Sequence, residues 1–242
     1  MGELKVRVNY VKGDEVRFLS HLDLARTIKM ALRRARWPVA VTGGFSPKMR
    51  VSFYSPLPVG TAGYDEYADV VMDVPTDIPD GKFPIEGGMS SMPEFLSQLT
   101  LRLSETLPLG ISAKEVFQAP KDEEPFESRI ACSLYEAHIK GAESKALSSA
   151  IDDFLISPSV SYDIHGPKGT RTLDLRRFVE NGHITLSANP ETGIIRLSMK
   201  IKHMDGRTAR PQWVIDSLSR FGFCVDAREI IVNRLEIILG RY

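Results

Sequence analysis

Hydrophobic and polar residues alternate at the start of the chain and then recur at helical spacing. Every second residue from Leu4 to Tyr10 is apolar, which predicts a β-strand with one buried face. From Ser20 onward the apolar positions repeat every three or four residues, which predicts a helix capped by this serine. The expected buried stripe comprises Ala25, Ile28, Leu32 and Ala35. Pro38 disfavours helical geometry in the residue before it, so the helix is expected to end near Arg36.

The remaining pattern of the first half predicts three more strands, a second helix and a last strand. The strands are expected over residues 39–41, 49–54 and 67–72, the helix over 92–106 and the last strand over 113–118. The order β-α-β-β-β-α-β matches a ferredoxin-like plan with one extra edge strand. Residues 73–91 are rich in Pro, Gly and Asp, which predicts an irregular insertion.

A similar order of elements recurs after residues 121–125, which are charged, contain a proline and are the best candidate for a linker. Strands are expected over 132–139, 159–164, 172–175, 183–188, 194–203 and 227–239, and helices over 142–155 and 210–221. The sequence therefore predicts an α+β chain of two tandem ferredoxin-like units, with domains at 1–120 and 126–242.

The charge of the chain is zero overall but unevenly distributed. Residues 1–60 contain eleven Lys and Arg against four Asp and Glu, a local net charge of +7. Residues 61–130 contain five against fourteen, a local net charge of −9. A basic segment in a neutral chain can bind a polyanion locally. The acidic segment could instead fold over the basic one and neutralise it.

The predicted first helix and the glycine-rich loop after it hold most of these cations. Basic side chains in this arrangement can follow a phosphate backbone. Two glycines allow close approach of the loop backbone, and Phe45 or Trp37 could stack on an unpaired base. Candidate RNA-binding residues are Arg17, Arg26, Lys29, Arg33, Arg34, Gly43, Gly44, Phe45, Lys48 and Arg50. The alternatives are a solvated helix face paired with the acidic segment, with Trp37 and Phe45 in the core, or a protein-docking surface.

His21 is the candidate catalytic residue, because histidine titrates near neutral pH and an RNA-cleaving site needs such a group. Asp23 lies two residues further on, so the two side chains point about 200° apart on a helix and cannot share one proton. The simpler interpretation is that Asp23 caps the helix and His21 forms a hydrogen bond in its first turn.

Arg210 precedes Pro211 at the start of a predicted helix, a position that favours an anion, and it is a further RNA-binding candidate. No Walker loop, dinucleotide fingerprint or metal-ligand spacing is present, so neither a cofactor nor a metal is expected. Cys132 and Cys224 form no CxxC pair, the opening residues lack a secretory signal, and no apolar run could span a bilayer. A cytoplasmic protein is therefore expected, with no membrane contact and no evident DNA specificity.

Several segments resemble the radical-SAM-linked protein family, a bacterial domain encoded beside or fused to a radical-SAM protein. They are Arg17–Leu24, Ala31–Ala35, Trp37–Ala40, Gly44–Pro47, Ser55–Gly60 and Glu66–Tyr67. The family loop usually reads Gly-Phe-Asn-Pro-His-Pro, whereas this chain has Gly44–Met49 as GFSPKM, without the histidine. A radical-SAM enzyme holds its cluster with three closely spaced cysteines, which this chain lacks. Either a separate partner carries the cluster, or the chain works alone in a different way. The first interpretation is the more economical one.

These observations lead to three hypotheses. The preferred one is a non-catalytic accessory protein that binds structured RNA, such as tRNA or rRNA, for a radical-SAM partner enzyme. The second is a metal-independent RNA-processing endoribonuclease that uses His21. The third is a protein-only scaffold for the radical-SAM partner.

Overall fold

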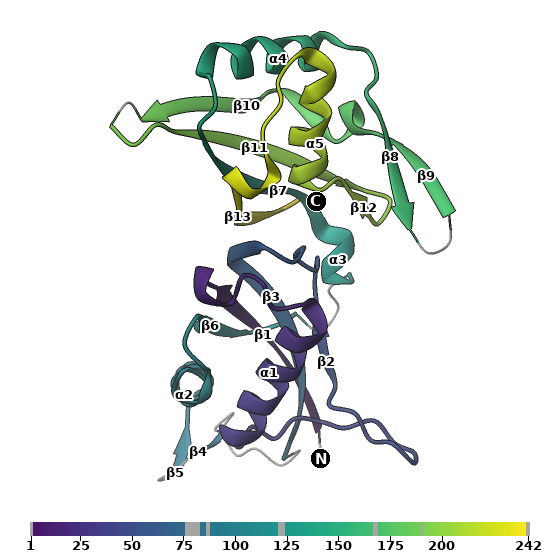
Figure 1. Cartoon of the computed structure of the whole chain (residues 1–242). Coiled ribbons are helices and arrows are strands. Elements are labelled where there is room, and N and C mark those ends of the chain that lie inside the picture. The colour runs from purple at the N-terminus through teal and green to yellow at the C-terminus, as the bar shows by residue number, and fades with distance from the viewer. Residues whose placement is uncertain are drawn as a thin grey trace. The chain divides into compact units, whose positions relative to one another are not determined.

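Two units, Met1–Phe126 and Glu127–Tyr242, make up the chain. The computed structural model in Figure 1 describes residues 2–75, 83–85, 88–120, 124–166, 169–189 and 191–240. Each unit combines helices with an antiparallel sheet, so the predicted α+β class is confirmed. Residues 121–123 of the predicted linker and residues 76–82, 86 and 87 of the predicted insertion lie outside the described residues.

The N-terminal unit has a sheet of four strands in the order β6-β1-β3-β2, with antiparallel neighbours throughout. These strands are β1 (Gly2–Lys12), β2 (Val51–Phe53), β3 (Thr61–Val74) and β6 (Ile111–Gln118). The helices are α1 (His21–Arg34) and α2 (Met92–Thr106), and a 3-10 turn, η1, spans Asp14–Val16. A small hairpin of β4 (Phe83–Ile85) and β5 (Gly88–Ser90) precedes α2.

The predicted first helix is α1, with Ser20 as its cap. The hydroxyl of Ser20 accepts a hydrogen bond from the backbone N–H of Asp23 at 3.2 Å. The helix ends at Arg34 rather than Arg36, because Arg36 adopts a left-handed φ of 55° that cannot continue a helix. The buried residues of α1 are Leu24, Ile28, Ala31 and Leu32, whereas Ala25 is only half-buried.

The predicted strand at residues 39–41 does not form as a strand. Val39 makes an isolated bridge to Met72 on β3, whereas Val41 makes one to Met49. Because the partner changes within three residues and Pro38 offers no backbone N–H, no continuous ladder forms.

The core of the N-terminal unit lies between one face of its sheet and the two helices. The alternating side chains from Leu4 to Tyr10 of β1 pack against buried residues of α1 and α2, such as Leu32 and Leu99. The intervening β1 residues point to the opposite face of the sheet. Arg7 and Asn9 on that face are nevertheless buried.

The short helix α3 (Phe126–Arg129) contains the division between the units, and the C-terminal sheet follows it. This sheet has the order β10-β11-β7-β13, again with antiparallel neighbours. Its strands are β7 (Ile130–Lys140), β10 (Val179–Asn189), β11 (Ile194–Met204) and β13 (Ile230–Leu239). The strand β12 (Arg207–Thr208) pairs antiparallel with the end of β11, and β8 (Ser161–Gly166) pairs with β9 (Gly169–Asp174) as a separate hairpin.

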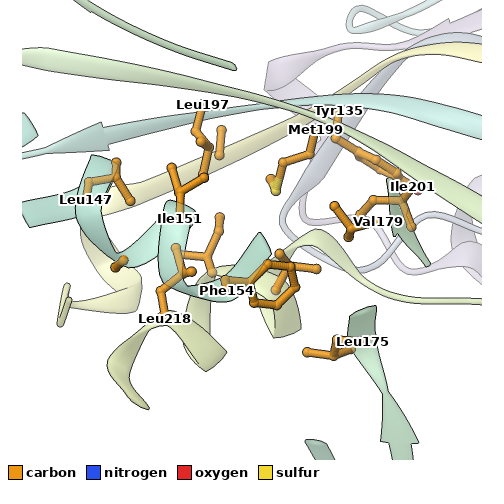
Figure 2. Packing of buried hydrophobic residues seen from close by; sticks show 14 of the residues in the cluster. Tyr135, Leu147, Ile151, Phe154, Leu175, Val179, Leu197, Met199, Ile201 and Leu218 are labelled. Carbon is orange, nitrogen blue, oxygen red and sulfur yellow. The ribbon is translucent and has the colours of Figure 1, made fainter. Parts of the chain in front are cut away.

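Helices α4 (Ser144–Ile156) and α5 (Pro211–Ser217) complete the C-terminal unit, with 3-10 turns η3 (Leu175–Arg177), η4 (Leu218–Phe221) and η5 (Ala227–Glu229). Figure 2 shows Leu147, Ile151 and Phe154 of α4 in the same buried cluster as Leu197 and Met199 of β11. These side chains are at most 6% exposed, so the helix is held on the sheet by apolar burial.

Candidate functional site

Three cations form a basic ridge on the outward side of α1. Arg26, Lys29 and Arg33 are spaced three and four residues apart, so they follow one helical face, away from the buried stripe. Arg26 keeps 76% of its side chain exposed, and Arg33 is also exposed. Arg34 is exposed on the flank of the same helix. The helix therefore presents a row of positive charge to solvent.

The acidic segment, residues 61–130, does not neutralise this basic ridge within the described part of the chain. Arg26 pairs with Asp23 of its own helix at 3.3 Å, an exposed contact of small energetic weight. No ion pair to Lys29, Arg33 or Arg34 is found among the described residues. Asp65 contacts Asn9 and Lys114 elsewhere in the unit.

The glycine-rich loop is the tip of a hairpin, named here the 41–49 hairpin, which projects from the N-terminal unit between α1 and β2 (dark blue in Figure 1). The backbone N–H of Thr42 donates to the carbonyl of Lys48 at 2.9 Å, and the N–H of Lys48 donates to the hydroxyl of Thr42 at 3.0 Å. Gly44 has a φ of 103°, which few other residues adopt. These features shape the tip without any contact to the core.

Phe45 and Trp37, the two candidate stacking residues, lie in opposite environments. Phe45 is fully exposed at the tip of the 41–49 hairpin, with a relative exposure of 111%. Trp37 is 6% exposed and packs in the core of the unit. Only Phe45 therefore presents a ring face that a base could reach.

Arg17 does not lie on the exposed ridge. It is 9% exposed, its Nε donates to the carbonyl of Gly60 at 2.9 Å, and its Nη1 lies 3.2 Å from Asp14 Oδ1. The ammonium of Lys12 donates to the carbonyls of Arg17 and Leu19 at 2.8 and 3.0 Å. These contacts tie the segment before α1 to the loop that ends at Gly60, so they position the start of the helix.

His21 is the first residue of α1, and its ring lies edge-on to Phe53 at a centroid distance of 5.9 Å. Burial lowers the pKa of His21, and the nearby positive charges of Lys12 and Lys29 lower it further, so the neutral form of the ring is favoured. The Asp23 carboxylate contacts Ser20 and Arg26. The arrangement supplies a neutral imidazole beside the basic ridge.

A buried polar cluster lies on the other face of the sheet, and no local pattern in the sequence predicts it. Arg7 of β1 and Asp69 of β3 are direct cross-strand partners, and Arg7 donates through Nε and Nη2 at 2.7 and 3.0 Å. Lys5 Nζ lies 2.9 Å from Asp69 Oδ2, and the hydroxyl of Tyr54 donates to the same oxygen at 2.8 Å. The Arg7 guanidinium also lies 3.9 Å from the ring centroid of Phe126. This aromatic ring covers the Arg7 side chain.

The carboxyl of Asp69 is held ionised in this cluster. Burial alone would raise the pKa of Asp69, but hydrogen bonds from Arg7, Lys5 and Tyr54 and the charge of Arg7 outweigh it and lower the pKa. A cavity of about 500 Å³ opens beside the cluster, and Arg50 lies on its wall. Arg50 also pairs with Glu3. The cavity thus has both basic and acidic groups at its surface.

The remaining candidate, Arg210, lies in the C-terminal unit. It is exposed at the N-terminus of α5, and its guanidinium lies 5.1 Å from the ring centroid of Trp213. No group of three or more His, Cys, Asp or Glu side chains with metal-binding geometry occurs among the described residues. Within the same part of the chain, no helix combines the length and apolar character needed to cross a bilayer.

Residues 5–83 and 89–211 match the model of a bacterial family described as "Uncharacterized protein conserved in bacteria (DUF2344)". The match covers most of both units, and the chain belongs to this family. No curated protein matches the chain. The matched residues span the segments that form the basic ridge, the 41–49 hairpin and the buried polar cluster.

Proposed function

We propose that the chain binds structured RNA, such as tRNA or rRNA, through the basic ridge of α1 and the 41–49 hairpin. The observation that carries the proposal is that Arg33, Lys48 and the ring of Phe45 are all exposed to solvent. Cations of this kind attract phosphates, and an exposed ring can stack on an unpaired base. Arg17 contributes indirectly, by holding the start of α1.

Reversal of two charges tests this proposal. The variant with Arg33→Glu and Arg34→Glu should bind a tRNA fragment weakly, and its affinity should depend less on salt than that of the parent. A matched control reverses Lys140 and Lys145, two exposed cations of the C-terminal unit, and should bind like the parent. Equal RNA affinity of the two double variants, measured by fluorescence anisotropy at several salt concentrations, would contradict the proposal.

We further propose that the chain is a non-catalytic accessory of a radical-SAM enzyme in the cytoplasm. The resemblance of its N-terminal half to the radical-SAM-linked family supports this role, as does the lack of three clustered cysteines. Cys132 and Cys224 form no disulfide, which is usual in a reducing compartment. Co-purification from a native bacterium, with and without nuclease treatment, tests the partnership. A partner that remains bound after nuclease treatment, with no RNA recovered beforehand, would favour the protein-only scaffold instead.

The endoribonuclease alternative makes a separate prediction. The purified chain would cleave RNA in the presence of EDTA, and His21→Ala would abolish the cleavage while leaving RNA affinity nearly unchanged. Intact RNA after prolonged incubation with the parent protein would exclude this alternative.

For the architecture, we propose that each unit is ferredoxin-like. The strand orders β6-β1-β3-β2 and β10-β11-β7-β13 support this. In each of these four-stranded sheets, counted in chain order, the first strand lies beside the third and the last. The hairpin of β8 and β9 would then be an insertion in the second unit. An experimental structure of either unit tests the assignment.

A further inference from the structure

The C-terminal unit contains a cavity of about 360 Å³ beside α5 and the turns that follow it. Its volume lies within the range of about 300–1,000 Å³ that small-molecule sites occupy. The lining comes from β8, from the α5–η4 segment and from residues 223–230. All of it belongs to one unit, so the cavity is independent of the basic ridge.

Aromatic rings form one wall of this cavity. Tyr162 and Trp213 stack with a centroid distance of 5.9 Å and an interplanar angle of 27°. Phe223 lines the cavity as well and is 4% exposed, and Ile215, Val225 and Ile230 add aliphatic surface. Such a lining favours a flat ring, which gains area and offset stacking at little conformational cost.

A carboxylate is the charged group on the lining. Asp216 is exposed, and its Oδ2 accepts a hydrogen bond from the hydroxyl of Tyr162 at 2.8 Å. A carboxylate has about four acceptor positions, so Asp216 retains capacity for another donor. No Lys or Arg is among the lining residues found in the described part of the chain. Of the nearby cations, Arg210 lies over the ring of Trp213, and Arg220 donates to the carbonyl of Ser161.

We propose that this cavity binds a small planar aromatic compound that carries a protonated amine. The ring packs against Trp213 and Tyr162, and the ammonium group donates to Asp216. The ligand is not a phosphate compound, because the lining offers an anion no cationic partner. This site therefore differs in chemistry from the RNA surface proposed above.

Two probes with the same ring and opposite charge test the proposal on the full-length chain. Tryptamine carries an ammonium group and indole-3-acetate a carboxylate, and both fit the volume of the cavity. By isothermal titration at pH 7, tryptamine should bind at least about tenfold more tightly, as a charge-assisted hydrogen bond implies. Equal affinities, or no heat from tryptamine at millimolar concentration, would overturn the proposal.

Variants and a chemical footprint locate the bound probe. Asp216→Asn should remove the preference for tryptamine, whereas Asp153→Asn, an exposed carboxylate on α4, should leave it unchanged. Cys224 lines the cavity and is exposed, whereas Cys132 is buried. Tryptamine should therefore slow alkylation of Cys224 by iodoacetamide, as followed by peptide mass spectrometry. Unaltered alkylation at saturating tryptamine, or a preference that survives Asp216→Asn, would place the probe elsewhere and refute the assignment.

Discussion

Arg7 and Asp69 face each other across β1 and β3, and the two N–H···O contacts between them measure 2.7 and 3.0 Å. Both side chains are only 3% exposed, so this is a bidentate ion pair removed from water. A buried ion pair adds little net stability relative to an apolar pair, but the loss of one partner leaves an uncompensated charge. The stability of the chain should therefore be sensitive to single substitutions at either residue of the pair.

The first prediction follows from this pair. Asp69→Asn should destabilise the chain by about 3–5 kcal/mol, because Arg7 would remain buried without its counter-charge. Asp73→Asn, which removes an exposed carboxylate from the same strand, should change stability by less than about 0.5 kcal/mol. Urea unfolding followed by circular dichroism measures both. A loss below about 1 kcal/mol for Asp69→Asn would show that water or a neighbouring group replaces the carboxylate.

The second prediction concerns the pH dependence of stability. Burial and the charge of Arg234 lower the pKa of His203 from 6.5 to about 4, while its Nε2 lies 3.1 Å from the hydroxyl of Ser133. Because the unfolded chain takes up this proton first, stability is lost as the pH falls from 6.5 towards 4. The loss should reach about 3 kcal/mol, because each pKa unit of the shift corresponds to about 1.4 kcal/mol.

Denaturant unfolding at several pH values tests this dependence. His203→Gln should flatten the curve between pH 6.5 and 4, whereas His165→Gln, a change at an exposed histidine on β8, should leave its slope as it is. A curve that keeps its slope in His203→Gln would assign the pH dependence to other groups.

The third prediction concerns the electrostatics of His21. Since the positive charge of Lys29 lowers the pKa of His21, Lys29→Gln should raise it. Lys48→Gln removes a charge from the 41–49 hairpin, which is not among the causes of the shift, and should leave this pKa unchanged. Proton NMR titration of the imidazole resonances measures both. A larger response to Lys48→Gln would mean that the hairpin folds over the start of α1.

The fourth prediction separates binding from folding at two phenylalanines. Phe45→Ala should leave the unfolding free energy unchanged, because the ring is fully exposed, and should weaken RNA binding about tenfold through lost stacking. Phe95→Ala removes a ring that is 6% exposed on α2 and should cost about 3–5 kcal/mol of stability. Thermal melts combined with RNA titrations distinguish the two effects. A destabilised Phe45→Ala variant would contradict the exposed position of the tip.

Local pattern was sufficient to find most of the elements. The alternation from Leu4 to Tyr10 and the helical spacing that follows Ser20 are each set by residues within a few positions of one another. The α+β class follows from these local signals. The segment at residues 39–41 was predicted as a strand because it is apolar, but a strand also needs a continuous partner, which its sequence does not encode.

The geometry of the candidate site was harder to predict, because it depends on contacts between residues that are far apart in the sequence. Arg7 and Asp69 are 62 positions apart, so neither had a neighbour in sequence that indicated a buried pair. In the sequence, Arg17 is one more cation next to a basic helix. Its hydrogen-bond partner Gly60 lies 43 positions away, so no local pattern indicates that Arg17 is buried. The difference between Trp37 and Phe45 likewise depends on whether tertiary structure covers the ring, which composition does not determine.

The 41–49 hairpin is closed by Thr42 and Lys48 and makes its turn outside the core. Its residues can therefore change during evolution without a penalty in folding, as long as these closing contacts and the backbone at Gly44 are kept. Under the RNA-binding function proposed above, substitutions at the tip should therefore affect recognition rather than folding. A saturation library confined to residues 43–47 would thus report ligand preference directly, and chimaeras that exchange this segment between family members should exchange specificity while they fold alike.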